Sequence, residues 1–312
     1  MPRIRARHRT DDVSPEVAVS GELFAPVSPG VELCYQTFGK PDADPLLLVM
    51  GLGGPMTWWP DELCKQLAES GFYVIRFDNR DTGRSTRIQG RVTRPMIVRA
   101  FLGRRTTAPY RLTDLAADAF GLLDHLGLSS AHVTGVSMGG MIAQKMAIEK
   151  PQRVRSLVSI MSTTGRRTVG WQDPRILPAM LAPKGSDLEA YAAAAIKMGA
   201  LIGSPGYPED AESARARAET TFNRGLSGAG VLRHMLAVLA QQDRAPRLRQ
   251  LRMPAAVIHG MEDRMVHPSG GRATAQAIPG ATLLLIPGMG HDLPPALFPT
   301  YVDVIRRTAD KV

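Results

Sequence analysis

The sequence predicts an α/β fold, in which a mostly parallel, doubly wound sheet of eight strands carries an inserted helical lid. Three observations support this prediction. Apolar runs typical of strands alternate with segments of helical apolar spacing along most of the 312 residues. Between residues 165 and 247 the alternation gives way to helical stretches with no convincing strand. It then resumes, so the helical block is expected to be an insertion between two strands of one sheet.

The strands are predicted from short apolar runs bounded by turn residues. The first two should pair antiparallel, because only the turn residues Ser-Pro-Gly (28–30) lie between them. The third, LLLVM, is a continuous apolar run of the kind that is buried on both faces. The predicted strands are 22–27, 31–38, 46–50, 72–78, 132–136, 154–162, 254–260 and 281–288.

The helices are predicted from apolar residues that recur every three or four positions. The predicted helices are 61–70, one that begins at 113–114, 138–150, 188–201, 209–224, 230–240, about 268–277 and about 295–308. We therefore expect a core of residues 21–164 and 248–312 and a helical cap over 165–247. Such a cap would cover the carboxyl ends of the strands, where open α/β sheets bind ligands.

Length and composition are those of an ordinary globular protein. The chain is 44% hydrophobic and 21% charged, and its longest relevant apolar run, 46–50, is far shorter than the roughly 20 residues that span a bilayer. No apolar segment of a secretory signal follows the charged N-terminus, so residues 1–20 are expected to form a flexible basic arm. The two cysteines are too few for a disulfide scaffold and are expected to be reduced and packed, which fits a cytoplasmic protein.

Part of the net charge of +9 is concentrated in one segment. Eight arginines and no acidic residue lie between Asp81 and Asp114. Such a run could meet an acidic partner or an anionic lipid surface. We favour a solvated loop instead, because the chain uses arginine throughout, with 31 arginines against 7 lysines. Nucleic-acid binding is not expected, since no aromatic-studded or groove-reading motif accompanies the charge.

The strongest candidate for a reactive residue is the serine in Gly-Val-Ser-Met-Gly-Gly (135–140). A predicted strand ends at Val136 and a predicted helix begins at Met138, so Ser137 lies on the turn between them. A turn of this kind strains the serine backbone and exposes its hydroxyl at the top of the sheet. The string G-x-S-x-G is weak by itself, but between a buried strand and an apolar helix it predicts a nucleophile.

A serine nucleophile needs a base, and His291 is the best placed histidine. It follows the last predicted strand in Gly-Met-Gly-His (288–291). His267 is the main competitor, whereas His259, at the end of a buried strand, is expected to pack or hydrogen-bond locally.

The base in turn needs a carboxylate to orient it, and Asp263 follows the strand that resumes after the insertion. Glu262 is its closest rival, and Asp292 is a poor one because it adjoins His291. The chain order Ser137, Asp263, His291 is the order expected for this arrangement.

Two backbone N–H groups are expected to bind the oxyanion that forms on the substrate. Met138, the residue after the nucleophile, supplies one, and Leu52 in the glycine-rich loop Gly-Leu-Gly-Gly (51–54) supplies the other. The same loop could instead be a plain tight turn. Five residues could contact an apolar part of a substrate, although each could equally belong to the core. They are Gly51, Trp58, Trp59, Met180 and Met198.

With these pieces in order, the chain resembles the α/β-hydrolase superfamily over about residues 21–308. Five segments are similar to the aclacinomycin methylesterase and carboxylesterase branch: LLLVMGLGG, WWPDEL, VIRFDNRDTGRST, GVSMGGMIAQ and IPGMGH. The resemblance implies the α/β-hydrolase fold and a serine esterase of the EC 3.1.1 type that cleaves a carboxylic ester through an acyl-enzyme on Ser137. It implies neither a cofactor nor a metal.

The chain departs from the wider family pattern at two places. Met50 stands where a histidine is common before the glycine-rich loop, and Asp81 replaces a glycine in the turn 78–85. Asp78 and Arg80 of that turn are expected to pair with each other as part of the scaffold near the site, with substrate contact as the alternative. The polyketide methylesterase branch resembles this chain in both features, so neither departure argues against activity.

The same triad could act on another bond, as in a C–C bond hydrolase, a thioesterase or a perhydrolase. Haloalkane dehalogenases and epoxide hydrolases are excluded, because both need an aspartate at the position of Ser137. A non-catalytic ligand-binding protein of this fold is a remote alternative. The expected partner is a small-molecule ester with an apolar part, with no nucleic acid and no stable membrane anchor, and the sequence indicates neither the natural ester nor the oligomeric state.

Overall fold

The computed structural model describes residues 17–176, 178–179 and 187–312. Its eight strands form one sheet in the order β1-β2-β4-β3-β5-β6-β7-β8. β1 and β2, and β2 and β4, pair antiparallel, and all the other neighbours run parallel. The strands are β1 (Leu23–Ser28), β2 (Val31–Phe38), β3 (Asp44–Val49), β4 (Phe72–Phe77), β5 (Ala131–Val136), β6 (Val154–Ile160), β7 (Ala255–Gly260) and β8 (Thr282–Ile286). The predicted eight-stranded, mostly parallel sheet is confirmed.

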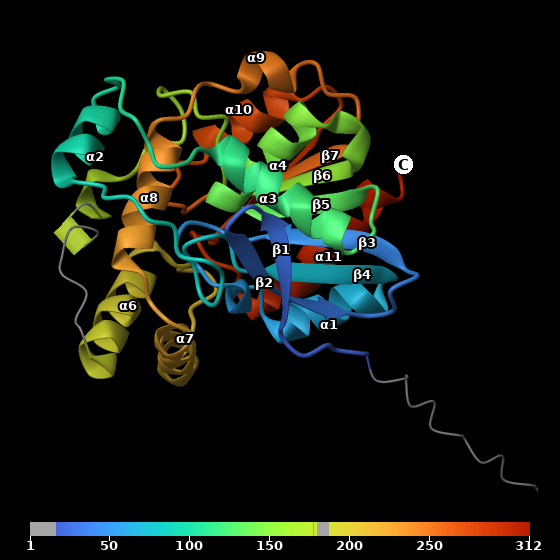
Figure 1. The fold of residues 1–312 in the computed structure, drawn as a ribbon, viewed down its shortest axis with the longest axis horizontal. Helices are drawn as coiled ribbons and strands as arrows, with labels where there is room; N and C mark the ends of the chain where they lie inside the picture. The colour runs from blue at the N-terminus through green and yellow to red at the C-terminus, as the bar shows by residue number, and fades with distance from the viewer. Residues whose placement is uncertain (1–16, 177, 180–186) are drawn as a thin grey trace, which may run out of the picture.

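Helices cover both faces of this sheet (Figure 1). α3 (Leu112–His125), α4 (Met138–Glu149), α9 (Ala245–Leu248) and α10 (Ser269–Ala277) contribute to the core on one face, and α1 (Asp61–Glu69) and α11 (Phe298–Ala309) to the core on the other. A second group gathers beside the sheet: α2 (Arg94–Phe101), α6 (Leu188–Ile202), α7 (Ala211–Asn223) and α8 (Gly228–Leu239).

β3 shows how the apolar runs build these two cores. Leu46 and Leu48 pack with α1 and α11, whereas Leu47 and Val49 pack with α3 and α4, and all four side chains are fully buried. Successive residues of a strand point to opposite faces, so a strand covered on both sides is apolar throughout rather than alternating. Truncating any one of these leucines to alanine would cost about 2–5 kcal/mol of stability.

Two expectations for the basic segments change with the structure. The prediction of a solvated loop between Asp81 and Asp114 is wrong for part of this segment, because residues 94–101 form α2. Of the arm expected over 1–20, residues 1–16 lie outside the described residues. Val19 forms a bridge with Phe38 at the end of β2, so the part of this arm next to the core is attached to the sheet. Within the described ranges, no helix is long and apolar enough to cross a membrane.

Candidate active site

Ser137 lies on the sharp turn between β5 and α4. Its backbone has φ 55° and ψ −120°, a conformation rare for a residue with a side chain. The turn is possible because glycines flank it. A Cβ on Gly135 would lie 2.2 Å from the Gly139 carbonyl oxygen, and one on Gly139 would lie 2.0 Å from that of Val49. From the end of the neighbouring strand, the Ser162 hydroxyl donates to the Ser137 carbonyl oxygen over 2.7 Å.

Ser137, His291 and Asp263 form one hydrogen-bonded chain. The Ser137 Oγ lies 3.0 Å from Nε2 of His291, and Nδ1 of the same ring lies 2.8 Å from Oδ2 of Asp263. The three residues follow β5, β8 and β7, whose carboxyl ends meet at one edge of the sheet because these strands run parallel. This arrangement has the reach that a nucleophile, a base and an orienting acid require.

The surroundings of Asp263 keep it ionised. Burial alone would raise the pKa of this carboxyl, but the charge of His291 and the hydrogen bonds from His259 and His291 hold the pKa at about 2. The second oxygen, Oδ1, accepts the backbone N–H groups of Met265 and Val266 over 2.9 and 2.8 Å. An ionised carboxylate can only accept, so Nδ1 of His291 carries the ring proton and Nε2 is left to accept the proton of the Ser137 hydroxyl.

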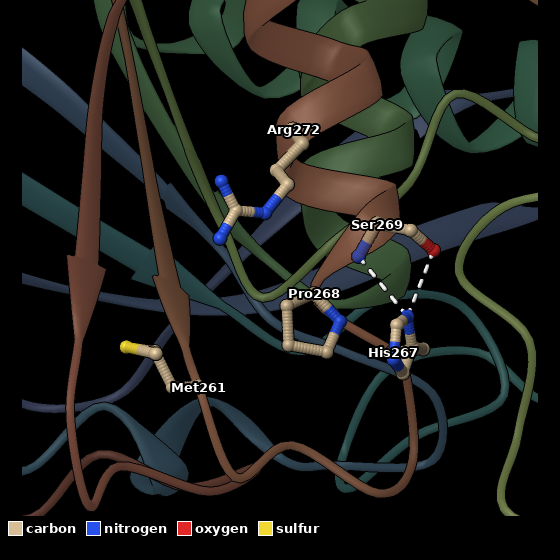
Figure 2. A pocket seen from close by; sticks show the side chains of 5 residues that line it. All are labelled: Met261, His267, Pro268, Ser269 and Arg272. Atoms are coloured by element: carbon tan, nitrogen blue, oxygen red, sulfur yellow. Dashed lines mark hydrogen bonds between the residues drawn. The ribbon is translucent and has the colours of Figure 1, made fainter.

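The other two histidines considered from the sequence make different contacts. His267 is hydrogen-bonded to Ser269, with 2.9 Å between Nδ1 and Oγ, and its ring stacks on Trp171 with centroids 4.1 Å apart. It lines a surface pocket of about 230 Å³ to which neither Ser137 nor His291 contributes (Figure 2). Nε2 of His259 donates to the Val266 carbonyl oxygen over 2.7 Å, the local hydrogen bond that the sequence led us to expect, and also lies 3.3 Å from Oδ2 of Asp263.

The rival carboxylates also lie outside this chain of hydrogen bonds. Glu262 is exposed. Asp292 accepts from the hydroxyl and the backbone N–H of Ser204, and burial raises its pKa against those hydrogen bonds. The side chain of Asp263, in contrast, is fully buried and is the one that reaches His291.

The glycine-rich loop after β3 lies against Ser137. β3 and β5 are neighbouring parallel strands, with Val49 opposite Gly135, so the loop after β3 meets the turn after β5. A Cβ on Gly51 would lie only 3.2 Å from the Cβ of Ser137. Among the described residues, neither the Leu52 nor the Met138 backbone N–H has a hydrogen-bond acceptor. Both are therefore available as donors beside Ser137.

His234 of α8 holds this loop, and the sequence analysis did not single it out. Its Nδ1 accepts the Gly53 backbone N–H over 3.2 Å, and its Nε2 donates to the Arg80 carbonyl oxygen over 2.9 Å. Burial lowers the pKa of His234 to about 4, which keeps the ring neutral. A neutral ring can accept a hydrogen bond at Nδ1 and donate one from Nε2. No sequence pattern marks this residue, because its partners are backbone atoms some 150 and 180 residues away in the chain.

Buried ion pairs attach the inserted helices to the turn 78–85. Arg233 of α8 binds both oxygens of Asp81 at 2.8 and 2.7 Å, and Tyr110 donates to the same carboxylate. Burial and the bond to Asp81 together raise the pKa of Tyr110. Asp81 itself has φ 70°, which is the conformation that the glycine of the wider family pattern would adopt without strain.

The expected pair between Asp78 and Arg80 does not form. Asp78 binds Arg224, which follows α7, with 2.8 Å between its Oδ2 and the guanidinium. Arg80 binds Asp118 of α3, with 2.6 Å between Nη2 and Oδ1. The sequence could not show this, because both true partners lie far along the chain, and Arg224 lies within the inserted segment.

The inserted segment also contacts the loop that carries His291. The His291 backbone N–H donates to the Ile202 carbonyl oxygen over 2.7 Å, and the Gly290 N–H donates to the Ser204 hydroxyl over 2.8 Å. The Gly206 N–H donates to the Gly288 carbonyl oxygen over 2.9 Å. The end of α6 therefore holds the histidine loop, just as α8 holds the glycine-rich loop.

The residues suggested for substrate contact are spread over several places. Trp58 donates from Nε1 to the Thr221 hydroxyl of α7 over 2.9 Å. Trp59 is fully buried in the core beside α1, which is the alternative that the sequence allowed. Met198 lies on α6 and is half-buried, and Met180 lies outside the described residues. In the part of the chain that is described, no group of three or more His, Cys, Asp or Glu side chains could hold a metal ion.

Comparison with known sequences and structures gives consistent matches. The family described as alpha/beta hydrolase fold matches residues 44–294. Rhodomycin D methylesterase DauP of Streptomyces sp. (strain C5) is 30% identical over 288 residues, which is 86% of this chain and 91% of the relative. Rhodomycin D methylesterase DnrP of Streptomyces peucetius is 29% identical over the same length and the same shares of both chains.

Solved structures agree on the fold. A hydrolase from Pseudomonas aeruginosa PA01 superposes with a TM-score of 0.70 at 25% identity, over 93% of this chain and 98% of the other. The enol-lactonase from Burkholderia xenovorans LB400 gives a TM-score of 0.71 at 23% identity, over 92% of this chain and all of the other.

Proposed function

The chain belongs to the alpha/beta hydrolase fold family and is a carboxylic ester hydrolase, and we propose that Ser137, His291 and Asp263 are its nucleophile, base and orienting acid. One observation carries this proposal. The three side chains are linked at 3.0 and 2.8 Å, with the serine on a strained turn and the acid buried and ionised.

The proposed reaction has two halves. In the first, Nε2 of His291 takes the proton of the Ser137 hydroxyl while Oγ attacks the ester carbonyl carbon. The C–O bond to the alcohol then breaks, and His291 gives its proton to the leaving oxygen. In the second, His291 removes a proton from water, whose oxygen attacks the acyl-enzyme. The carboxylic acid departs, and Ser137 regains its proton from His291.

The oxyanion of each tetrahedral intermediate is assigned to the backbone N–H groups of Leu52 and Met138. Both lack an acceptor among the described residues, and the loop that carries Leu52 lies against Ser137. One such donor contributes about 10²–10³-fold to the rate. His234 supports this assignment as a positioning residue, because it fixes the next peptide of the same loop.

Residues 165–247 are proposed to form the cap that closes the substrate site. The support is that helices of this segment are attached both to the glycine-rich loop and to the loop that carries His291. Gly51, Trp58 and Met198 are the proposed substrate contacts among the described residues. The buried, free thiols Cys34 and Cys64 are compatible with the reducing cytoplasm, which we propose as the enzyme's location.

For the substrate, we propose a methyl ester of a largely apolar acid. The support is the pair of rhodomycin D methylesterases at 29% and 30% identity, which match most of this chain. The test is a substrate panel of p-nitrophenyl esters of increasing acyl length, a polyketide methyl ester and a thioester. We expect the methyl ester to give the highest kcat/KM and Ser137→Ala to abolish turnover of every substrate. A preference for the thioester over all oxygen esters would contradict the proposal that the enzyme cleaves the C–O bond of a carboxylic ester.

A further inference from the structure

α2 and the residue that follows it expose three large apolar side chains, while Met96 and Ile97 are only partly buried. Val98, Phe101 and the capping residue Leu102 are 56%, 55% and 62% exposed, whereas Ala100 is 2% exposed and faces the molecule. At about 100° of rotation per residue, Arg94, Val98, Phe101 and Leu102 share one arc about 100° wide. Three large apolar side chains exposed within five residues are unusual, because a fold normally buries such groups.

Basic side chains lie within and beside this arc. Arg91, Arg94, Arg99, Arg104 and Arg105 are all exposed, and no acidic residue lies between Asp81 and Asp114 to neutralise them. Within the described ranges, none of these five arginines forms an ion pair, although the chain forms many elsewhere. We call the exposed residues 91–105 of this segment the α2 surface.

The α2 surface is fixed to the rest of the protein at both its back and its end. α2 packs on α8, the helix whose His234 contacts the glycine-rich loop. Arg167 donates to the carbonyl oxygens of Ala100 and Phe101 and so caps the carboxyl end of α2. A partner that docks on this surface would therefore be separated by α8 from the glycine-rich loop that His234 contacts; α2 and α8 lie side by side in Figure 1.

We propose that the α2 surface binds reversibly to a membrane surface that carries anionic lipids. Exposed Phe, Leu and Val side chains enter the interface between headgroups and acyl chains, while the surrounding arginines pair with lipid phosphates. A symmetric contact between two copies of this chain fits less well, because it would place the arginines of one α2 surface against those of the other. The membrane would bring a substrate with an apolar part to the cap side of the enzyme.

The experiment is cosedimentation of the full chain with vesicles, using Ser137→Ala protein so that no lipid ester is cleaved. Vesicles of phosphatidylcholine alone are compared with vesicles that also contain phosphatidylglycerol. We expect binding to the anionic vesicles that weakens as salt is raised. A basic side chain at an anionic surface contributes roughly a fivefold gain in binding, so Arg94→Gln and Arg99→Gln should each lower the partition coefficient by about fivefold.

Matched controls separate this surface from the net charge of the chain. Arg249→Gln removes the same charge at an exposed position near α9 and should change binding little. Phe101→Ser with Leu102→Ser should weaken binding strongly, whereas Leu283→Ser, at a 38% exposed leucine of β8, should not. The same substitutions are also made in protein that keeps Ser137. These variants should hydrolyse a short, soluble p-nitrophenyl ester at the wild-type rate, which shows that they fold.

Three results would overturn the proposal. One is equal binding to both kinds of vesicle or to neither, and another is an equal effect of Arg249→Gln and Arg94→Gln. The third is a wild-type dimer by light scattering that becomes a monomer in the Phe101→Ser, Leu102→Ser variant, because the α2 surface would then be a self-association face. Since all binding is measured on Ser137→Ala protein, failure here leaves the proposed catalytic roles untouched.

Discussion

Asp263 receives hydrogen bonds on both of its carboxylate oxygens, and this makes a selective substitution possible. Asparagine can keep its carbonyl oxygen in the place of Oδ1, where Met265 and Val266 donate. Its amide NH₂ then faces His291, so Nδ1 must accept and Nε2 carries the ring proton. We expect Asp263→Asn to lower kcat by about 10³–10⁴-fold without unfolding the protein, as measured by steady-state kinetics and circular dichroism.

The control for that variant is Glu262→Gln, since Glu262 is the adjacent, exposed carboxylate. It should keep nearly the full kcat. If the two substitutions reduced kcat equally, the assignment of the acid to position 263 would be wrong.

A second prediction concerns His234 as a positioning residue. Phenylalanine fills a similar volume but cannot accept the Gly53 N–H, so the glycine-rich loop loses one of its attachments. We expect His234→Phe to lower kcat roughly 10–100-fold while KM changes less, because misplacing a donor by a fraction of an ångström affects the transition state most. His234→Gln, whose amide can both accept and donate, should recover part of the loss. If His234→Phe changed KM but not kcat, or if His234→Gln recovered no activity, His234 would have a merely structural role.

The same histidine predicts a pH dependence of stability. Its pKa is lowered by burial from 6.5 to about 4, so between these values the unfolded chain binds a proton that the folded chain does not. The stability contributed by neutral His234 is therefore complete above pH 6.5 and is lost as the pH falls towards about 4. Lowering the pH from about 7.5 to about 5 should cost wild type about 2 kcal/mol more than His234→Gln in urea denaturation. Parallel pH profiles for the two proteins would contradict the neutral, buried state of this ring.

At the scale of elements, buried charge pairs fix α8 to the turn 78–85. Arg233 and Asp81 have side chains that are 6% and 0% exposed, and Asp81 without Arg233 would be a buried charge with only Tyr110 and one backbone N–H as partners. We expect Arg233→Met to lower the free energy of unfolding by about 3–5 kcal/mol, measured by urea denaturation. Arg215→Met, which breaks an exposed pair with Glu189, should cost at most about 1 kcal/mol. If Arg233→Met and Arg215→Met lowered the free energy of unfolding by similar amounts, the pair of Arg233 and Asp81 would not be what holds α8.

The elements also show where sequence reasoning succeeds. Strand and helix positions follow from local apolar periodicity, and β5, Ser137 and α4 form a local unit that one short motif specifies. Contacts between distant segments could not be predicted in the same way. Arg224, Arg233 and His234 carry no pattern of their own, and their partners depend on how the inserted helices lie on the core. The helix α2 was missed because its apolar residues are spread around much of the helix, so the sequence lacks the single apolar stripe by which a helix is recognised.

For the whole molecule, the sheet and the inserted helices contribute different parts of one site. The parallel strands bring Ser137, Asp263, His291 and the glycine-rich loop to a single edge. The inserted helices hold the glycine-rich loop through His234 and the histidine loop through residues 202–206. Both loops are therefore held by the sheet and by the inserted helices. This suits a reaction whose rate depends on the exact direction of backbone N–H groups.

The central claim is that ester hydrolysis passes through a covalent intermediate on Ser137. The most direct measurement is reaction with a fluorophosphonate probe, followed by mass spectrometry of the intact chain and of its fragments. We expect one adduct per chain, located at Ser137. The adduct and ester hydrolysis should both be lost in Ser137→Ala, and labelling should be strongly slowed in Asp263→Asn. Wild-type protein that hydrolyses esters but takes up no probe, or an adduct that persists in Ser137→Ala, would contradict it.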